Sequence, residues 1–308
     1  MPRLLFFNQT PGNCYVVRAI CKVARIEQEF EMSSTHWQNV PRLNFMYLHA
    51  ARLQAHYAAQ WLARAARAYV PERPHDGHTS LGWDDGFGGL TTHALPDGAR
   101  LRLRIADLTL AVLGGAAAEL PLDGRAEPEV RDWLGRQMAA RGLDAKLLDA
   151  PSPYAMPAHV LATGGRYSLD ELGEALAAHA AWFANAHGAL GAVQKKLAAR
   201  GLKAPPVRCW PHHFDMDCLV ALARGRSMGI GYCPGDEFCD EPYFYTSMWP
   251  EPPIPKLPLL PAMAHWHTYK FLAALAPAHK IVAAHDQGAY VATFLDVAVA
   301  AALKALRS

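Results

Sequence analysis

The chain has 308 residues, of which 51% are hydrophobic and 19% charged, and Lys plus Arg (30) nearly balance Asp plus Glu (28). This composition indicates a folded, water-soluble protein with a substantial core. A formal charge of only +2 provides no basic surface for nucleic acid or anionic lipid. No run approaches the roughly 20 apolar residues that span a bilayer. We therefore expect neither a nucleic-acid nor a membrane partner, and the composition leaves the oligomeric state open.

Two further features favour a cytoplasmic location. The first residues, Met1 to Phe7, lack a long apolar stretch with a small-residue cleavage site. The cysteines show no Cys-x-x-Cys spacing and are expected to be reduced, mostly buried thiols. They are Cys14, Cys21, Cys209, Cys218, Cys233 and Cys239.

Residues 1–31 show the pattern strand, turn, helix, strand, with Pro11-Gly-Asn-Cys14 at the start of the helix. This stretch weakly resembles the first β-α-β unit of a thioredoxin-like or glutathione-transferase domain. The resemblance implies that Cys14 contacts a thiol, a role that requires a lowered thiol pKa. Alternatively, residues 1–31 are an N-terminal appendage and the functional chain begins at residue 32.

A long helix followed by short strands is predicted for residues 32–150. No Gly or Pro interrupts residues 45–69, and Pro71 ends that helix. His49 and His56 lie two turns apart on it, too far to bind one metal ion, and are expected at the surface.

The strands of this half follow from alternation of apolar and polar residues. Leucines and arginines alternate over 101–105, and the alternation changes phase at 106–107 before continuing over 108–112, which predicts a bulge or a tight turn. A third strand is predicted at 118–122, followed by a helix over 127–140.

Residues 151–308 repeat the order of long helix and then strands. Ser168-Leu-Asp-Glu171 has the pattern of a capping box, which predicts a helix from there to Gly201 with His179 as a core histidine. Strands are predicted at 207–215, 228–233 and 243–249, a stiff proline-rich connector at 250–261, and helices at 265–276 and 289–306.

These elements predict an α+β fold, in which antiparallel sheets pack with long helices in one compact domain over 32–308. Because both halves, 32–150 and 151–308, place a long helix before a sheet, we consider an internal duplication as a hypothesis.

The candidate functional site lies in Arg208–Asp217, Gly229–Glu237 and Glu241–Pro250, where histidines and acids occur among many aromatic residues. Aromatic side chains favour burial, whereas His, Asp and Glu need partners once they are buried. Such a mixture indicates either a binding or catalytic pocket or a satisfied internal network.

Two catalytic versions of the site are open. On an extended strand His213, Asp215 and Asp217 would share one face, with His212 and Phe214 on the other, and this trio has ligand types that suit zinc, iron or manganese. Without a metal, His213 would transfer a proton while Asp215 orients it.

A turn at Pro234-Gly235 brings two further acids to the site, so that the predicted catalytic residues are His213, Asp215, Asp236 and Glu237. Tyrosine hydroxyls on the strand over 243–249 would line the pocket. The predicted substrate-binding residues are His212, Tyr243, Tyr245, Trp210, Glu241 and His267.

Several of these segments resemble a bacterial family of domains of unknown function. The resemblance rests on Trp210–Asp215 (WPHHFD), on the PGDE turn ending at Glu237, on Glu241–Tyr245 (EPYFY) and on Trp266-His267. Cys233 replaces the serine that precedes the turn in that family. The resemblance spans about residues 36–305 and implies a site without implying a reaction.

The sequence therefore predicts an uncharacterised small-molecule enzyme with a pocket of histidines and carboxylates, with or without a divalent metal. The alternative is a ligand-binding or scaffold protein in which the His and Asp side chains form a structural hydrogen-bond network.

Overall fold

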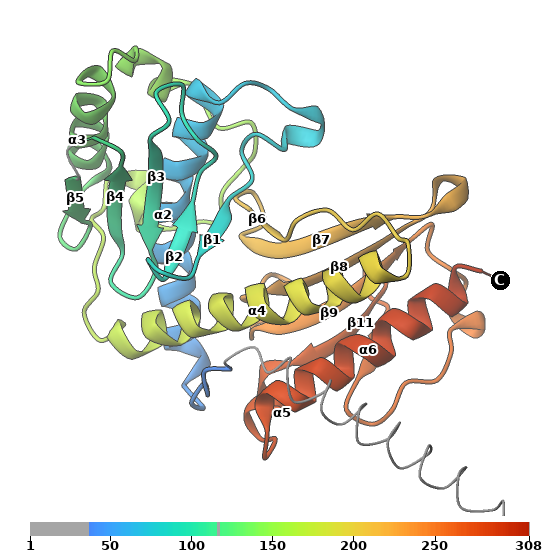
Figure 1. The fold of residues 1–308 in the computed structure, drawn as a ribbon. Coiled ribbons are helices and arrows are strands. Elements are labelled where there is room, and N and C mark those ends of the chain that lie inside the picture. Colours follow the sequence, from blue (N-terminus) through green and yellow to red (C-terminus); the bar gives the residue numbers. More distant parts are fainter. Residues whose placement is uncertain (1–36, 116–117, 308) are drawn as a thin grey trace, which may run out of the picture. The chain divides into compact units, whose positions relative to one another are not determined.

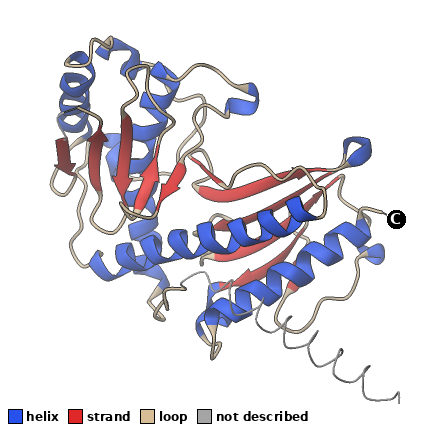
Figure 2. Ribbon diagram, viewed as in Figure 1, coloured by secondary structure: helices blue, strands red, loops and turns tan. Residues whose placement is uncertain are grey.

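Two antiparallel sheets and the long helices packed on them make up the described part of the chain (Figures 1 and 2). The computed structural model describes residues 37–115 and 118–307, and the chain from Trp37 onward forms one compact unit. The α+β prediction is confirmed. The predictions for residues 1–31, including Cys14, lie outside the described residues.

Helix α2 (Phe45–Tyr69) has the bounds that the sequence predicts. The Asn44 side chain caps it by accepting a hydrogen bond from the Met46 backbone N–H at 2.9 Å. The helix ends at Val70, because Pro71 cannot continue it.

The first sheet is a meander of five strands in sequence order. Leu101 and Leu103 are fully buried, while the alternating arginines of the same strand point to the opposite face. The phase change after residue 105 is a tight turn between two paired strands, as predicted. Helix α2 packs against this sheet, and α3 (Glu127–Ala139) lies beside its last strand. The strands are β1 (Gly82–Asp84), β2 (Gly89–Thr91), β3 (Arg100–Arg104), β4 (Thr109–Leu113) and β5 (Ala118–Pro121).

The second sheet has six strands in the order β10-β11-β9-β8-β7-β6. Helices α4 (Gly173–Ala199) and α6 (Gln287–Ala305) lie along the same face of it, as Figure 1 shows. The short helix α5 (Ala278–Val282) leads from the sheet into α6. The strands are β6 (Arg208–Trp210), β7 (Asp215–Ala221), β8 (Ser227–Cys233), β9 (Tyr243–Trp249), β10 (His265–His267) and β11 (Ala273–Pro277).

The two sheets meet edge to edge. Leu81, just before β1, and Cys209 in β6 exchange both backbone hydrogen bonds, at 2.8 and 2.9 Å. Each half thus contains a long helix followed by an antiparallel sheet, but only the first sheet keeps sequence order. The duplication stays a hypothesis.

Two predicted helices differ from the structure. Residues 265–276 are not a helix: β11 lies between β9 and β10 with all five of its residues buried, so sheet pairing overrides the helical preference of its alanines. The helix predicted from Ser168 begins only at Gly173, because the backbone turns at Glu171, which has a φ of 60°.

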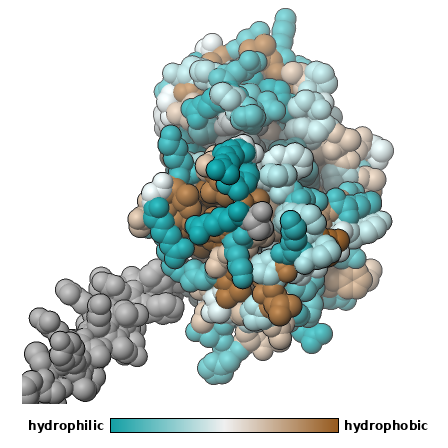
Figure 3. Space-filling view, turned by 90° about the vertical axis from the view of Figure 1, so that its right-hand side faces the viewer, coloured by the Kyte–Doolittle hydropathy of each residue, from teal (hydrophilic) through white to brown (hydrophobic). Residues whose placement is uncertain are grey.

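The proline-rich connector has the expected form. Between β9 and β10 it contains only the short 3₁₀ turn Ile254–Lys256, and it leaves Leu259 98% exposed. Trp249, at the end of β9, is also exposed. On the face that Figure 3 shows, hydrophobic side chains likewise lie at the surface among hydrophilic ones.

Helix α6 is long and apolar enough to cross a membrane by length and composition alone, although Asp296 and Lys304 interrupt its apolar residues. Of its most apolar window, 44% is buried inside the protein, on the sheet and α4. A helix of a protein core has the same length and composition.

His179 is the core histidine that the sequence predicts. It is fully buried on α4, and its Nε2–H donates to the Leu48 carbonyl of α2 at 2.8 Å, while Nδ1 has no partner. Burial lowers the pKa of His179 from 6.5 to about 4. The imidazole is therefore neutral in the folded protein at pH 7.

This lowered pKa predicts a loss of stability in acid. Below pH 6.5 the unfolded chain binds a proton at His179 that the folded protein does not bind until about pH 4. We expect the free energy of unfolding of the native protein, relative to that of His179→Gln, to fall by about 2 kcal/mol between pH 7 and pH 4.5. Urea unfolding at both pH values measures this difference, in which the other titrating groups cancel. If the native protein and His179→Gln differed in free energy of unfolding by the same amount at both pH values, His179 would not be neutral in the folded protein.

Candidate functional site

The histidine pair lies at the tip of the hairpin that joins β6 to β7. Strand β6 ends at Trp210, whose carbonyl accepts hydrogen bonds from the backbone N–H groups of His213 (3.2 Å) and Phe214 (2.7 Å). Phe214 adopts a φ of 59° and is buried, whereas His212 and His213 are exposed. The predicted continuous strand over 207–215 is therefore wrong, because a turn interrupts it.

This turn separates His213 from the acids that were predicted to share its face. Asp215 and Asp217 do point to one side of β7, but His213 lies on the loop beside His212, with ring centroids 4.2 Å apart. Among the described residues no group of three or more His, Cys, Asp or Glu side chains could hold a metal ion. The proposed trio of His213, Asp215 and Asp217 is thus not assembled as a ligand set.

The hairpin tip opens onto a pocket of about 550 Å³. The pocket brings together four of the predicted site residues, namely His212, His213, Asp236 and Glu237. Its walls come from α2, from the hairpin tip, from the loop between β8 and β9, and from residues 155–157. The remaining lining residues are His49, Arg52, Leu53, His56, Ala155, Met156, Pro157, Phe214, Gly235, Phe238 and Asp240.

Helix α2 is the part of the site that the sequence interpretation missed. His56 is only 5% exposed, so its predicted surface position is wrong. Arg52 and Gln60 are buried as well, and the spacing of these three residues places them on one face of the helix. That spacing is the sequence signal that could have identified the wall.

His56 fixes the hairpin to the helix. Its Nε2–H donates to the Pro211 carbonyl at 2.8 Å, and its ring stacks on Phe214 with centroids 5.1 Å apart. Burial lowers the pKa of His56 to about 4, so the ring is neutral at pH 7.

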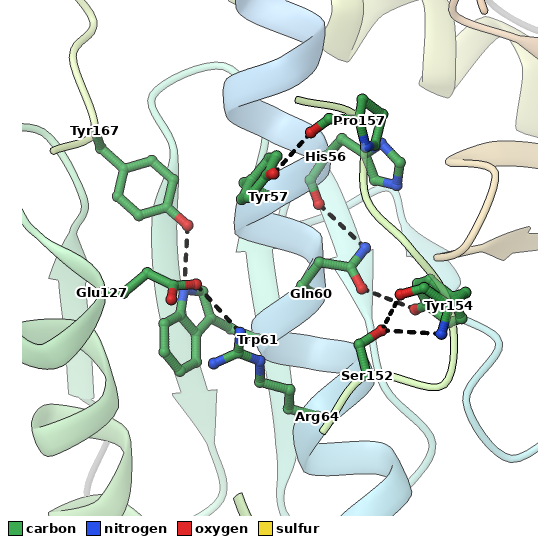
Figure 4. A network of polar contacts seen from close by, with 10 residues as sticks. All are labelled: His56, Tyr57, Gln60, Trp61, Arg64, Glu127, Ser152, Tyr154, Pro157 and Tyr167. Atoms are coloured by element: carbon green, nitrogen blue, oxygen red, sulfur yellow. Dashed lines mark hydrogen bonds and ion pairs between the residues drawn. The ribbon is translucent and has the colours of Figure 1, made fainter. Parts of the chain in front are cut away.

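Figure 4 shows how α2 also holds the segment 152–157, of which residues 155–157 line the pocket. The Tyr57 hydroxyl donates to the Pro157 carbonyl, and the Tyr154 hydroxyl donates to Gln60 Oε1, both at 2.8 Å. The Gln60 amide in turn donates to the Pro211 carbonyl at 2.8 Å. One glutamine therefore connects two walls of the pocket.

Asp236 lies in the pocket wall, but its oxygens already have partners. Oδ1 accepts from the backbone N–H groups of Phe238 (2.8 Å) and Cys239 (2.9 Å), and Oδ2 accepts from the Tyr243 hydroxyl at 2.6 Å. These contacts hold the loop after β8 in shape. Glu237, by contrast, is exposed at the rim and makes no hydrogen bond or ion pair within the described part of the chain.

Asp215 and Asp217 form a second polar group on the sheet, outside the pocket lining. The Tyr245 hydroxyl donates to Asp215 at 2.8 Å, and the Trp210 indole donates to Asp217 at 2.6 Å. Burial raises the pKa of Asp215 to about 6 and, together with the charge of Asp215, raises that of Asp217 to about 7. The predicted role of Asp215 in orienting His213 has no contact that supports it.

The two remaining predicted binding residues lie elsewhere. Glu241 lines a separate pocket of about 700 Å³, where it contacts His279 Nδ1 at 2.5 Å and accepts from the His279 backbone N–H at 2.7 Å. His267 is on the edge strand β10, where it contacts the Tyr269 carbonyl at 2.8 Å. The structure does not bring either of them to the histidine pocket.

Comparison with known proteins identifies no relative. No family model, no curated protein and no solved structure matches the chain. The resemblance to a bacterial family of unknown function stays a prediction, and the function must be inferred from the site.

The sheet network yields a prediction about Gly231. This glycine lies on β8 between Asp217 and Tyr245, and a Cβ there would overlap the tyrosine ring that reaches across it to Asp215. We expect Gly231→Ala to displace Tyr245 and to lower the free energy of unfolding by about 1–3 kcal/mol, through overpacking and the lost hydrogen bond.

Gly191→Ala is the matched control, since Gly191 lies within α4 and nothing would contact its added Cβ within 4 Å. This variant should be as stable as the native protein or more stable by about 0.5–1 kcal/mol. Chemical denaturation of the three proteins checks both statements. Equal stability of Gly231→Ala and the native protein would contradict the packing argument.

Proposed function

We propose that the protein is a small-molecule enzyme that uses acid–base chemistry in the pocket at the tip of the β6–β7 hairpin. One observation carries the proposal. His212 and His213 are exposed toward a pocket of about 550 Å³, and within the described residues neither imidazole makes a hydrogen bond to the protein. Histidines that serve the fold, such as His56 and His179, do make such bonds.

The surroundings of His212 favour its neutral form. Partial burial and the neighbouring His213 both lower the pKa of His212, so this ring is neutral at pH 7 and can accept a proton. His213 is beside it, and Glu237 is at the rim of the same pocket. In this proposal His213 transfers a proton to or from the substrate, and His212 and Glu237 supply a second acid–base pair.

The geometry favours the version without a metal. Asp215, Asp217 and Asp236, the acids that would have served as ligands or base, each accept a hydrogen bond from Tyr245, Trp210 or Tyr243, and of their oxygens only Oδ1 of Asp215 is buried without a partner in the described part of the chain. These same contacts also support the second candidate function, a ligand-binding protein without catalysis, in which the acids hold the strands and the pocket only binds.

Turnover of an unknown substrate separates the two functions. Purified protein is incubated with a mixture of cellular small molecules, and mass spectrometry follows each compound over time. We expect the native protein to convert at least one compound repeatedly and His213→Gln to convert it about 10²–10⁴ times more slowly, the range that a positioned acid–base group contributes.

His285→Gln serves as the control, because His285 is exposed and lines neither pocket described above. It should convert the compound at the native rate. Retention of a compound at one molecule per chain without conversion would support the binding function instead. Equal rates for the native protein and His213→Gln would exclude His213 from the reaction.

A further inference from the structure

Arg52 is a buried positive charge at the histidine pocket. It comes from the second turn of α2, is 9% exposed, and lines the pocket with His49 and His56. A guanidinium group stays protonated in proteins, so this site carries a full charge at neutral pH.

No carboxylate of the described residues pairs with this charge. The hydrogen bond of Arg52 is from Nη2 to His49 Nδ1, at 3.0 Å, and its Nε is buried without a partner. Two other well-covered arginines also have a buried Nε without a partner, but each has a counter-ion: Arg102 contacts Asp84 at 2.9 Å, and Arg141 contacts Asp97 at 3.5 Å. A buried charge without a counter-ion is costly, so its retention indicates that something else supplies the anion.

Arg52 lines the pocket of about 550 Å³, which has room for a small anion. Gly235 packs closely against the guanidinium, since a Cβ there would lie only 3.2 Å from Arg52 Nη1. Burial lowers the pKa of both His49 and His56, so these neighbours stay neutral and Arg52 supplies the positive charge. Neutral imidazoles can still offer hydrogen bonds to a ligand.

The rim of the pocket has the opposite sign. Glu237 and Asp240 are exposed there, and neither forms an ion pair within the described residues. Asp236, a third acid of the lining, is already hydrogen-bonded to Tyr243 and to two backbone N–H groups. One buried cation among these carboxylates suits a singly charged carboxylate better than a phosphate dianion. The same rim carboxylates would attract a positively charged amine on the ligand.

We propose that the ligand of this pocket is a small amino-acid-like zwitterion, whose carboxylate binds Arg52 and whose ammonium group faces Glu237 and Asp240. This inference rests on the proposed function only in assigning the ligand to the same pocket. A planar guanidinium and a carboxylate form charge-assisted, bidentate hydrogen bonds, so the contact would fix the orientation of the ligand beside His213.

Thermal melting of the full chain tests the proposal with defined probes: the common amino acids, acetate, inorganic phosphate and methylammonium chloride, each at matched ionic strength. We expect at least one amino acid to raise the Tm of the native protein by several degrees at saturation, acetate to raise it less, and phosphate and methylammonium to leave it unchanged. Arg52→Met should lose the rise, and Arg52→Lys should retain part of it.

The melting temperature without ligand supplies a second readout. Because Arg52 is a buried, unpaired charge, Arg52→Met should melt at the native temperature or above it. The matched control Arg102→Met should melt lower, because it leaves Asp84 unpaired, and should keep the rise with the amino acid. Melting reports binding and not turnover, so the result does not depend on whether His213 transfers a proton.

Three outcomes would overturn the proposal. The first is that no amino acid raises the Tm of the native protein, and the second is that the rise survives in Arg52→Met. The third is that phosphate alone stabilises the protein. If Arg52→Met does not fold, Arg52→Lys tests the proposal instead. A rise in Tm with the amino acid that is as large in Arg52→Lys as in the native protein would exclude a bidentate contact.

Discussion

The carbonyl of Pro211 connects the two halves of the protein at the site. It accepts hydrogen bonds from His56 Nε2 and from Gln60 Nε2, both at 2.8 Å, and both donors come from α2 in the first half. The acceptor belongs to the hairpin tip of the second sheet. These two bonds therefore fix the place of His212 and His213 relative to the helix. Without these two bonds, the hairpin tip would not be held against α2 as a wall of the pocket.

Burying the polar side chains of His56 and Gln60 costs free energy, and the packing of the other residues of α2 offsets this cost. The middle of the helix, residues 51–60, is buried throughout, and most of its other side chains are alanine, leucine and tyrosine. The apolar residues supply the packing energy, and His56 and Gln60 remain satisfied because each bonds to a carbonyl. Arg52 is the exception on this face, since no anion of the described protein pairs with it. Most of α2 therefore stabilises the fold, whereas Arg52 in its second turn is free to bind a ligand.

Much of the fold could be predicted because its signals are local. The bounds of α2 and β9 were correct, and so was the turn between β3 and β4, since caps, prolines and alternation act within a few residues. Strand β11 could not be predicted, because the alanines in Ala273–Pro277 favour a helix and only their neighbours β9 and β10 make them a strand.

The composition of the sequence could predict which segments form the site, but not how their side chains are arranged. The sequence located the segment with His212 and His213 and the turn before Glu237, which do meet at one pocket, but it predicted a continuous strand where the hairpin turns. It could not show that Phe214 would adopt a positive φ and turn His213 away from the strand face. The wall on α2 was missed although its residues share one face, since His49 and His56 were judged too far apart to bind one metal ion and were expected at the surface, and Arg52 was not considered with them.

The polar residues of this region fall into two groups that differ in whether their partners are already present. Asp215, Asp217 and Asp236 are each bound by an aromatic donor, and together they hold strands and a loop in place. Arg52 and Glu237 have no counter-ion among the described residues, and the imidazoles of His212 and His213 make no hydrogen bond there. Of the second group only Arg52 is buried, and a buried charge without a counter-ion lowers stability, so the fold alone does not explain its retention. The second group lines one pocket, and this is the arrangement expected where a ligand supplies the missing partners.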